Sequence, residues 1–173
     1  MSYDDFRLSI LSTPVQIGPT LNGINNNEYF GDGLAISENG RIIAIGAPNV
    51  WGGSGIGYVK VYQYNDVSYV QLGQTLTSSY SGDNFGRSIS LSYDGTVLAI
   101  GAQFRNSSNT GAGSAEVYAW NGSSWVIRGS TFNGQQAYSR FGANVALSAD
   151  GTVFAAAEPL LEVFRGSQRS GCL

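Results

Sequence analysis

The alternation of apolar and polar positions is clearest between residues 85 and 102, which read FGRSISLSYDGTVLAIGA. In the first half, Ile89 and Leu91 alternate with serines, which is typical of a strand with one buried face. The second half, TVLAIGA, is apolar at successive positions and indicates a strand that is buried on both faces. The Asp94-Gly95 pair between them tolerates the positive φ angles of a tight hairpin turn. The segment therefore predicts two antiparallel strands joined by a short turn.

The same pattern occurs again on either side of this segment. FGDGLAISENGRIIAIGA at 30–47 and FGANVALSADGTVFAAAE at 141–158 align with it. The leading phenylalanines, Phe30, Phe85 and Phe141, are 55 and 56 residues apart. The chain is therefore predicted to be a repeat protein, in which neighbouring units bury a common core.

A second hairpin is predicted at the end of each unit. SAEVYAW at 114–120 and WVIRGSTF at 125–132 are joined by NGSS, with Trp120 and Trp125 on either side of the turn. The preceding unit has Tyr64 and Tyr69 at these positions. Four antiparallel strands in each repeated unit are typical of the blades of a β-propeller. The predicted fold is all-β, with about three blades' worth of four-stranded antiparallel blades.

This interpretation divides the chain into a lead, a repeat region and a tail. The boundaries are 1–14 for the N-terminal lead, 15–166 for the repeats, with a lone strand at 15–21 and units near 30–84, 85–140 and 141–164, the last of them partial, and 167–173 for the C-terminal tail. Closed propellers need about four to eight blades, so we expect an open, partial propeller. Two explanations stay open: a truncated fragment of a longer repeat protein, or a homodimer that closes a six-bladed ring.

The quoted motifs resemble the FG-GAP repeat, which forms the propeller head of integrin α subunits and occurs in many surface proteins. FGDGLAISENGRIIAIGAP at 30–48 is the closest match, and the resemblance extends over about residues 15–164. It implies adhesion or display at a surface, outside the cell. The sequence itself leaves the localisation undetermined, because MSYDDFRLSILSTPVQ at the N-terminus does not resemble a secretory signal.

The hairpin turns differ from those of the calcium-binding members of this family, which carry an acid-rich loop there. Calcium takes about six to eight oxygen ligands, several of them from carboxylates. The corresponding stretches here, SENGR, SYDGT and SADGT, contain at most two acidic residues each and are too short to surround an ion. We therefore interpret Glu38, Asp94 and Asp150 as turn residues and predict no metal site and no cofactor.

Composition excludes several classes of function. The chain has no histidine, which rules out histidine-based catalytic triads and histidine metal sites. Its net charge of -3 and the lack of a basic stripe argue against binding to nucleic acid, and no apolar run is long enough to cross a membrane. The single cysteine, Cys172, cannot form an internal disulfide. The remaining acids, Glu116 among them, show no catalytic pairing and are expected on the solvated surface.

A binding surface is predicted on the side of the repeats that carries the long connections. In a propeller the two hairpin turns of each blade lie on one side and the longer loops on the other, where repeat scaffolds commonly bind their partners. Aromatic residues, arginines and one aspartate from these loops form the predicted ligand-binding face: Trp51, Tyr80, Asp83, Phe104, Arg105, Tyr138 and Arg140. The alternative is that several of them only cover the edges of the blades.

The predicted function is that of a recognition scaffold without enzymatic activity, with a protein or a carbohydrate as its ligand. One alternative is a propeller-based hydrolase, which would have to work without histidine. Another is a truncated gene remnant with no independent function.

Overall fold

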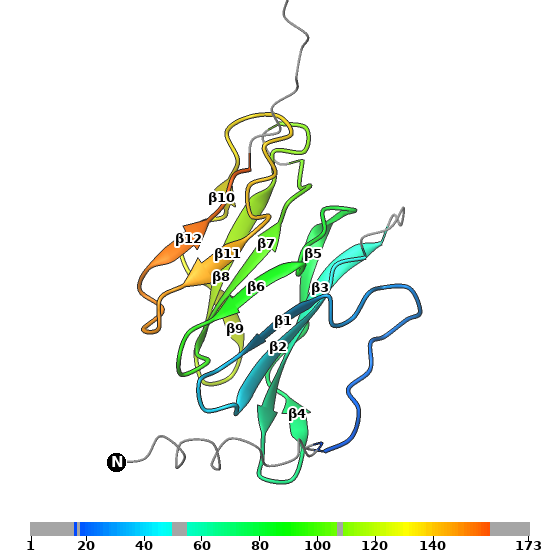
Figure 1. Cartoon of the computed structure of the whole chain (residues 1–173), viewed down its shortest axis with the longest axis vertical. Helices are drawn as coiled ribbons and strands as arrows, with labels where there is room; N and C mark the ends of the chain where they lie inside the picture. The colour runs from blue at the N-terminus through cyan, green and yellow to red at the C-terminus, as the bar shows by residue number, and fades with distance from the viewer. Residues whose placement is uncertain (1–15, 17, 50–54, 107–108, 160–173) are drawn as a thin grey trace, which may run out of the picture.

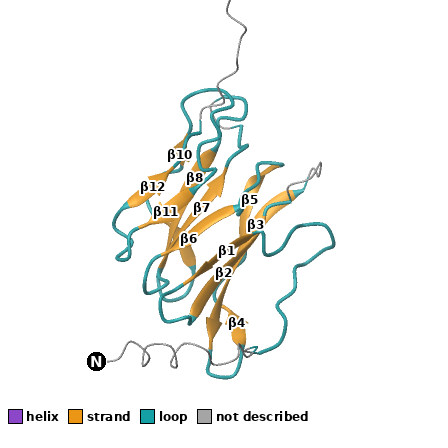
Figure 2. Ribbon diagram, in the orientation of Figure 1, coloured by secondary structure: helices purple, strands orange, loops and turns teal. Residues whose placement is uncertain are grey.

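The computed structural model describes residues 16, 18–49, 55–106 and 109–159. All regular structure in this part of the chain is β-strand, and the strands form antiparallel sheets with loops between them (Figure 2). The all-β prediction is therefore confirmed. Trp51, Cys172, the lead at 1–14 and the tail at 167–173 lie outside the described residues.

The first sheet contains the strands of the first repeat unit, in a meander along the chain. Its strands are β1 (Gly33–Ile36), β2 (Ile42–Ala47), β3 (Ile56–Tyr64), β4 (Tyr69–Gln71) and β5 (Leu76–Ser81). Neighbouring strands pair in the order β1-β2-β3-β4. β4 pairs with the end of β3, and β5 pairs with its beginning. β4 and β5 thus share one neighbour, and together they form the interrupted fourth strand of the unit.

The second sheet repeats this arrangement, and a smaller third sheet follows. The second sheet contains β6 (Ser88–Leu91), β7 (Val97–Ala102), β8 (Ser114–Trp120), β9 (Trp125–Ile127) and β10 (Phe132–Asn133). Both β9 and β10 pair with β8. The described part of the third unit contributes β11 (Val145–Leu147) and β12 (Phe154–Ala156). Figure 1 shows the short hairpin turns at the lower end of the sheets, and the loop residues 103–106, 109–113 and 134–144 at the upper end.

The hairpin turns follow the sequence prediction closely. Gly40, Gly95 and Gly151 have φ angles of 69°, 74° and 66°, the left-handed conformation that glycine adopts without steric cost. The Asp94 carboxylate accepts hydrogen bonds from the Thr96 backbone N–H at 3.0 Å and from the Ser92 hydroxyl at 2.7 Å. Asp94 is thus a turn residue that closes its own loop.

The first strand of each unit, β1, β6 or β11, carries large aliphatic residues on one face and small residues on the other, and the two faces of a unit are called large and small accordingly. In the second sheet, Ile89 and Leu91 point toward the first sheet and pack against its core. Ser88 and Ser90 on the same strand face the third sheet, where their hydroxyls accept hydrogen bonds from backbone N–H groups of β11. Because side chains alternate along a strand, the large face of one unit meets the small face of the unit before it.

The main core lies between the first two sheets. It combines buried residues of both sheets with the phenylalanine of the second unit: Ile42, Ala44, Val59, Val61, Leu76, Phe85, Leu98, Ile100, Ala102 and Trp125. A second, smaller cluster lies between the second and third sheets, where Val97, Ala99 and Val117 contact Val145, Leu147 and Phe154. All six residues of β7 are buried, as its apolar sequence predicts.

Glycines let the Phe-Gly turn of each unit approach the preceding sheet. A Cβ atom at Gly46 would lie 1.9 Å from the carbonyl oxygen of Gly86, and one at Gly101 would lie 2.0 Å from that of Gly142. Real Cβ atoms do not come this close to a backbone oxygen, so only glycine fits at the two positions. The contact between units therefore explains why glycine occurs at both Gly46 and Gly101 in the repeated AIGA motif.

The start of the repeat region differs from the prediction. A lone strand was expected at 15–21, but residues 18–21 form no strand. Gly18 passes the start of β4, where a Cβ atom on it would lie 3.2 Å from the Cα of Ser68, but the segment adds no strand beside β4. Gly18 nevertheless has a φ of 72°, close to the 77° of Gly73 and the 87° of Gly129, which lie one and two repeats further on. The segment keeps the backbone conformation of the repeat without its pairing.

Candidate functional site

The loops that precede the Phe-Gly pairs have the same backbone conformation in all three units. Asn27, Gly82 and Tyr138 have φ angles of 65°, 71° and 62°. Two residues further on, Tyr29, Asn84 and Arg140 have φ angles of 58°, 59° and 58°. Left-handed backbone is costly for bulky side chains, so Tyr138 and Arg140 are held in strained positions that asparagine or glycine would fill more easily. The same conformation occurs in each unit, so it belongs to the repeat and does not single out one loop.

A buried ion network connects the loops with the second sheet. Asp83 lies in the loop between β5 and β6, Arg105 in the loop after β7, and Glu116 on β8. The Arg105 Nε donates to the Asp83 carboxylate at 3.2 Å, and its Nη1 donates to Glu116. The side chain of Arg105 is 5% exposed, that of Asp83 is 1% exposed and that of Glu116 is 12% exposed. Arg105 is therefore held between two carboxylates, away from most of the solvent.

Both carboxylates accept further hydrogen bonds from neighbouring groups. Asp83 also accepts hydrogen bonds from the Ser78 hydroxyl at 2.5 Å and from the Phe85 backbone N–H at 3.0 Å. Glu116 accepts a hydrogen bond from the Tyr118 hydroxyl at 2.6 Å. Buried charges are tolerated when their hydrogen-bonding capacity is filled in this way.

Burial and hydrogen bonding shift the pKa values of Arg105 and Tyr118. Burial by itself lowers the pKa of Arg105, but the hydrogen bond to Glu116 and the attraction of both carboxylates outweigh it and raise the pKa above its usual value. Burial, together with the hydrogen bond to Glu116, raises the pKa of the Tyr118 phenol. Tyr118 is therefore protonated at neutral pH and acts as a donor.

Two aromatic rings lie against the guanidinium of Arg105. Its Cζ is 5.0 Å from the centroid of the Tyr80 ring and 5.8 Å from that of Phe85. Phe85 is fully buried, whereas Tyr80 is 45% exposed. Cations within about 6 Å of an aromatic face are attracted to its electrons. Arg105 thus fixes a tyrosine ring that remains open to solvent.

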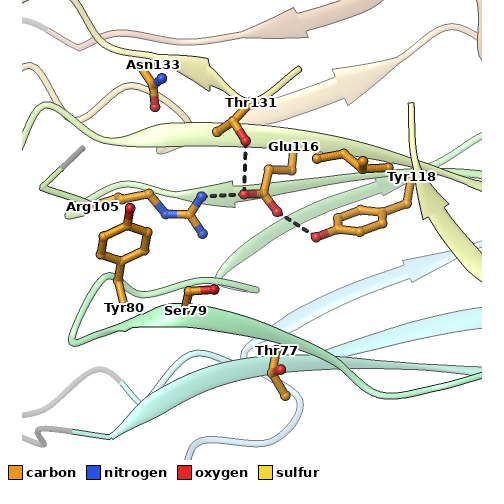
Figure 3. A pocket seen from close by; sticks show the side chains of 9 residues that line it. Thr77, Ser79, Tyr80, Arg105, Glu116, Tyr118, Thr131 and Asn133 are labelled. Carbon is orange, nitrogen blue, oxygen red and sulfur yellow. Dashed lines mark hydrogen bonds and ion pairs between the residues drawn. The ribbon is translucent and has the colours of Figure 1, made fainter. Parts of the chain in front are cut away.

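A cavity of about 720 Å³ opens beside this network, between β5 of the first sheet and β8 to β10 of the second (Figure 3). Its lining is rich in hydroxyl groups, with the Tyr80 ring beside them: Thr77, Ser79, Tyr80, Arg105, Glu116, Tyr118, Ile127, Thr131 and Asn133. Figure 3 shows Thr131 and Asn133 on one side, Thr77, Ser79 and Tyr80 on the other, and the Arg105–Glu116 pair between them. The Asn133 side-chain oxygen is buried and accepts no hydrogen bond from the described residues.

The structure divides the predicted binding residues into two groups. Tyr80, Asp83 and Arg105 come together at the cavity, where Asp83 and Arg105 are buried and serve to position Tyr80. Phe104 and Arg140 form a second pair, with the Arg140 guanidinium 5.2 Å from the Phe104 ring centroid. Tyr138 is 62% exposed on the loop of Arg140. Trp51 lies outside the described residues.

The expectation that Glu116 lies on the solvated surface is wrong. Its side chain is 12% exposed and is paired with Arg105 and Tyr118. The available signal was its position in β8, where a charge interrupts the strand SAEVYAW. A charge in the middle of such a strand needs a partner if its face is covered. Sequence reasoning also missed Thr131, which precedes β10, and Asn133, which lies on β10, because neither residue type nor position marked them as part of a cavity.

The equivalent corner of the first unit is built differently. Glu28 occupies the position of Asp83, one repeat earlier, and is 5% exposed. It accepts hydrogen bonds from the Asn25 backbone N–H at 2.9 Å and from the Tyr58 hydroxyl. Lys60 stands at the position of Glu116, and its Nζ lies 5.6 Å from the Tyr58 ring centroid instead of pairing with Glu28. Among the described residues, the arginine-centred network therefore belongs to the second unit.

The acidic side chains beside the cavity are already paired. Both carboxylates next to the cavity are paired with Arg105, so neither is a free base or nucleophile. In the described part of the chain, no three acidic or cysteine side chains come together in a way that could hold a metal ion. Nor does this part contain a helix that is long and apolar enough to span a membrane.

Comparison with known proteins adds no assignment. No protein-family model matches the chain, and no curated protein is significantly similar to it. The resemblance to the FG-GAP repeat therefore depends on the quoted motif residues alone.

Proposed function

We propose that the chain is a recognition scaffold without enzymatic activity, built from propeller blades of the FG-GAP type, and that it binds a neutral carbohydrate. The ligand occupies the cavity between β5 and β8 to β10. The observation that carries this proposal is the half-exposed Tyr80 ring, fixed by Arg105 at 5.0 Å, at the edge of a cavity lined mainly by hydroxyl groups.

The cavity wall matches the chemistry of a sugar. Sugars present hydroxyl groups that donate and accept hydrogen bonds, and their C–H faces stack on aromatic rings. The side chains of Thr77, Ser79 and Thr131 supply hydroxyls, and Tyr80 supplies the ring. Ligand sites generally combine such an apolar or aromatic surface with a few well-placed polar groups.

Charge favours a neutral ligand over an anionic one. Arg105 is the one cation among the residues that line the cavity, and its charge is neutralised by Asp83 and Glu116. The network carries a net negative charge, which repels phosphate, sulfate and carboxylate groups. A sialylated or sulfated sugar is therefore expected to bind more weakly than its neutral counterpart.

Binding can be tested with an array of neutral oligosaccharides and with calorimetry on those that are retained. Replacing Tyr80 by alanine should weaken binding about tenfold, which corresponds to ~1.4 kcal/mol. Tyr80→Phe keeps the ring and should bind nearly as well as the original chain. Tyr93→Ala removes a ring of similar exposure at the hairpin turn of the second unit and should have no effect.

Two results would contradict this proposal. One is an array on which no neutral oligosaccharide is retained by a chain whose thermal unfolding is cooperative. The other is equal binding by Tyr80→Ala and the original chain. A protein ligand on the loops of Phe104 and Arg140 would produce the first result.

A further inference from the structure

Each of the two contacts between sheets is made by the same pair of surfaces. The large face of the second unit, with Ile89 and Leu91, packs on the small face of the first, with Ile42 and Ala44. One repeat further on, the residues at the same positions pack in the same way: Val145 and Leu147 on Val97 and Ala99. In both contacts, therefore, the large face of one unit packs on the small face of the unit before it.

Two of these surfaces expose residues whose counterparts are packed between sheets, although Ile45, on the same face as Leu34, is only 7% exposed. On the first sheet, Leu34 and Ile36 occupy the positions of Ile89 and Leu91, yet they are 66% and 60% exposed. On the third sheet, Val153 occupies the position of Ile42 and Val97 and is 64% exposed, whereas both of its counterparts are 7% exposed. One open surface is a large face and the other is a small face.

Hydrogen bonds between the hairpin turns of successive units have the same direction, from one unit to the next. The Glu38 N–H donates to the Tyr93 carbonyl at 3.1 Å, and the Tyr93 N–H donates to the Ala149 carbonyl at 2.7 Å. These three residues stand at equivalent positions of successive units. Among the described residues, the Ala149 N–H therefore has no acceptor and the Glu38 carbonyl has no donor. The open donor lies on the third unit and the open acceptor on the first.

We propose that the small face of the third unit binds the large face of the first unit of a second copy of this chain, head to tail. In that contact Leu34 and Ile36 of one copy pack on Val153 and the exposed Ala155 of the other. The Ala149 N–H donates to the Glu38 carbonyl across the contact. A head-to-tail contact of this kind closes into a ring or continues as a filament.

Ala157 makes this contact looser than the two within the chain. It stands at the position of Gly46 and Gly101, where the following Phe-Gly turn approaches. A Cβ at those glycines would lie 1.9 and 2.0 Å from the incoming carbonyl oxygen. The Phe-Gly turn of the second copy must therefore stand further away, and Ala157→Gly should permit the closer spacing. This change is expected to tighten association about threefold or more.

The contact can be tested by light scattering on the whole chain after size-exclusion chromatography, over a range of micromolar concentrations. The expected mass is twice the 18.3 kDa of the chain or a higher multiple. Leu34→Asp and Val153→Asp each place a charge in the contact and should weaken association about tenfold or more. Both positions are exposed in the single chain, so circular dichroism should show an unchanged fold. Val67→Asp, at a site that is 78% exposed in a hairpin turn, is the matched control and should associate normally.

Mixing the two charged variants separates a head-to-tail contact from other arrangements. Leu34→Asp keeps its third-unit face and Val153→Asp keeps its first-unit face, so an equimolar mixture should form a dimer that neither variant forms alone. A contact between two copies of the first-unit face would instead be insensitive to Val153→Asp. A monomer at every concentration, an assembly that survives either charged variant, or no recovery in the mixture would overturn the proposal. None of these variants changes a residue that lines the Tyr80 cavity, so failure here leaves the carbohydrate proposal standing.

Discussion

The two contacts between sheets share one geometry but differ in what fills them. Between the first and second sheets, Phe85, Leu98 and Ile100 are fully buried, and Trp125 is 2% exposed. Between the second and third sheets, Val97, Ala99 and Val117 are the buried residues, and the apolar residues they meet are only half buried. The first contact therefore depends mainly on burial of large side chains, and the second has a smaller apolar area.

The second contact compensates with hydrogen bonds. The hydroxyls of Ser88 and Ser90 accept from the backbone N–H groups of Val145 at 2.9 Å and Leu147 at 3.1 Å. The corresponding positions of the first contact are Gly33 and Ala35, which have no hydroxyl. The same docking of one sheet on another thus tolerates either an apolar or a partly polar filling, provided that the glycines allow the close approach.

The largest effect is expected at the buried ion network of Arg105 with its two carboxylates. Arg105→Met leaves the buried Asp83 and the nearly buried Glu116 without their cation, and the loss of one partner from a buried ion pair costs about 3–5 kcal/mol. Urea unfolding followed by tryptophan fluorescence measures this loss. Adding Asp83→Asn and Glu116→Gln to Arg105→Met should recover part of it. Equal stability of Arg105→Met and the original chain would show that the network does not stabilise the fold.

A matched pair of leucines compares the apolar filling of the two contacts. Leu98 is 0% exposed in the first contact, and its replacement by alanine should cost about 2–5 kcal/mol. Leu147 is half buried in the second contact, and Leu147→Ala should cost about half as much, because less apolar surface returns to water. Urea denaturation of both variants measures the difference. Equal losses would mean that the two contacts are equally well packed.

A smaller effect is expected from the serines of the second contact. Ser88→Ala removes the acceptor of the Val145 N–H, and a typical hydrogen bond contributes about 0.5–1.5 kcal/mol. The variant should unfold at a lower temperature and exchange the Val145 amide proton faster. Ser123→Ala, in the exposed turn between β8 and β9, is the control for loss of a serine hydroxyl. An unchanged exchange rate at Val145 would contradict the compensation described above.

The smallest effect concerns the hairpin turn of the third unit at low pH. Hydrogen bonds from the Ser148 hydroxyl and from the Thr152 backbone N–H and hydroxyl lower the pKa of Asp150 to about 2. Because this pKa lies below its ordinary value, the stabilisation is complete above pH ~4 and is lost as the pH falls from ~4 to ~2. Asp150→Asn should show a shallower decrease of the unfolding temperature over that interval. A parallel decrease in both proteins would show that the carboxylate has no such role.

Much of the local structure was predictable because it depends on neighbours in the sequence. The Asp94-Gly95 and Asp150-Gly151 turns form where the sequence places them, since the turn residues tolerate the required φ angles. The candidate site was predictable only in part. Tyr80, Asp83 and Arg105 were chosen for their residue types and their loops, whereas Glu116 and Thr131 were missed. Arg105 and Glu116 are 11 residues apart, and Asp83 is 22 residues from Arg105, so their meeting depends on how the loops fold over the second sheet.

The sequence by itself determined the hairpins, their turns and the repeat, because alternation, turn residues and spacing are local properties of each unit. Only the tertiary structure decided which surfaces are covered. Leu34 and Ile89 stand in the same pattern one repeat apart, but Leu34 is 66% exposed and Ile89 is packed in the core. The physical reason is that burial requires a neighbouring sheet, and no pattern within one unit specifies whether that neighbour is present.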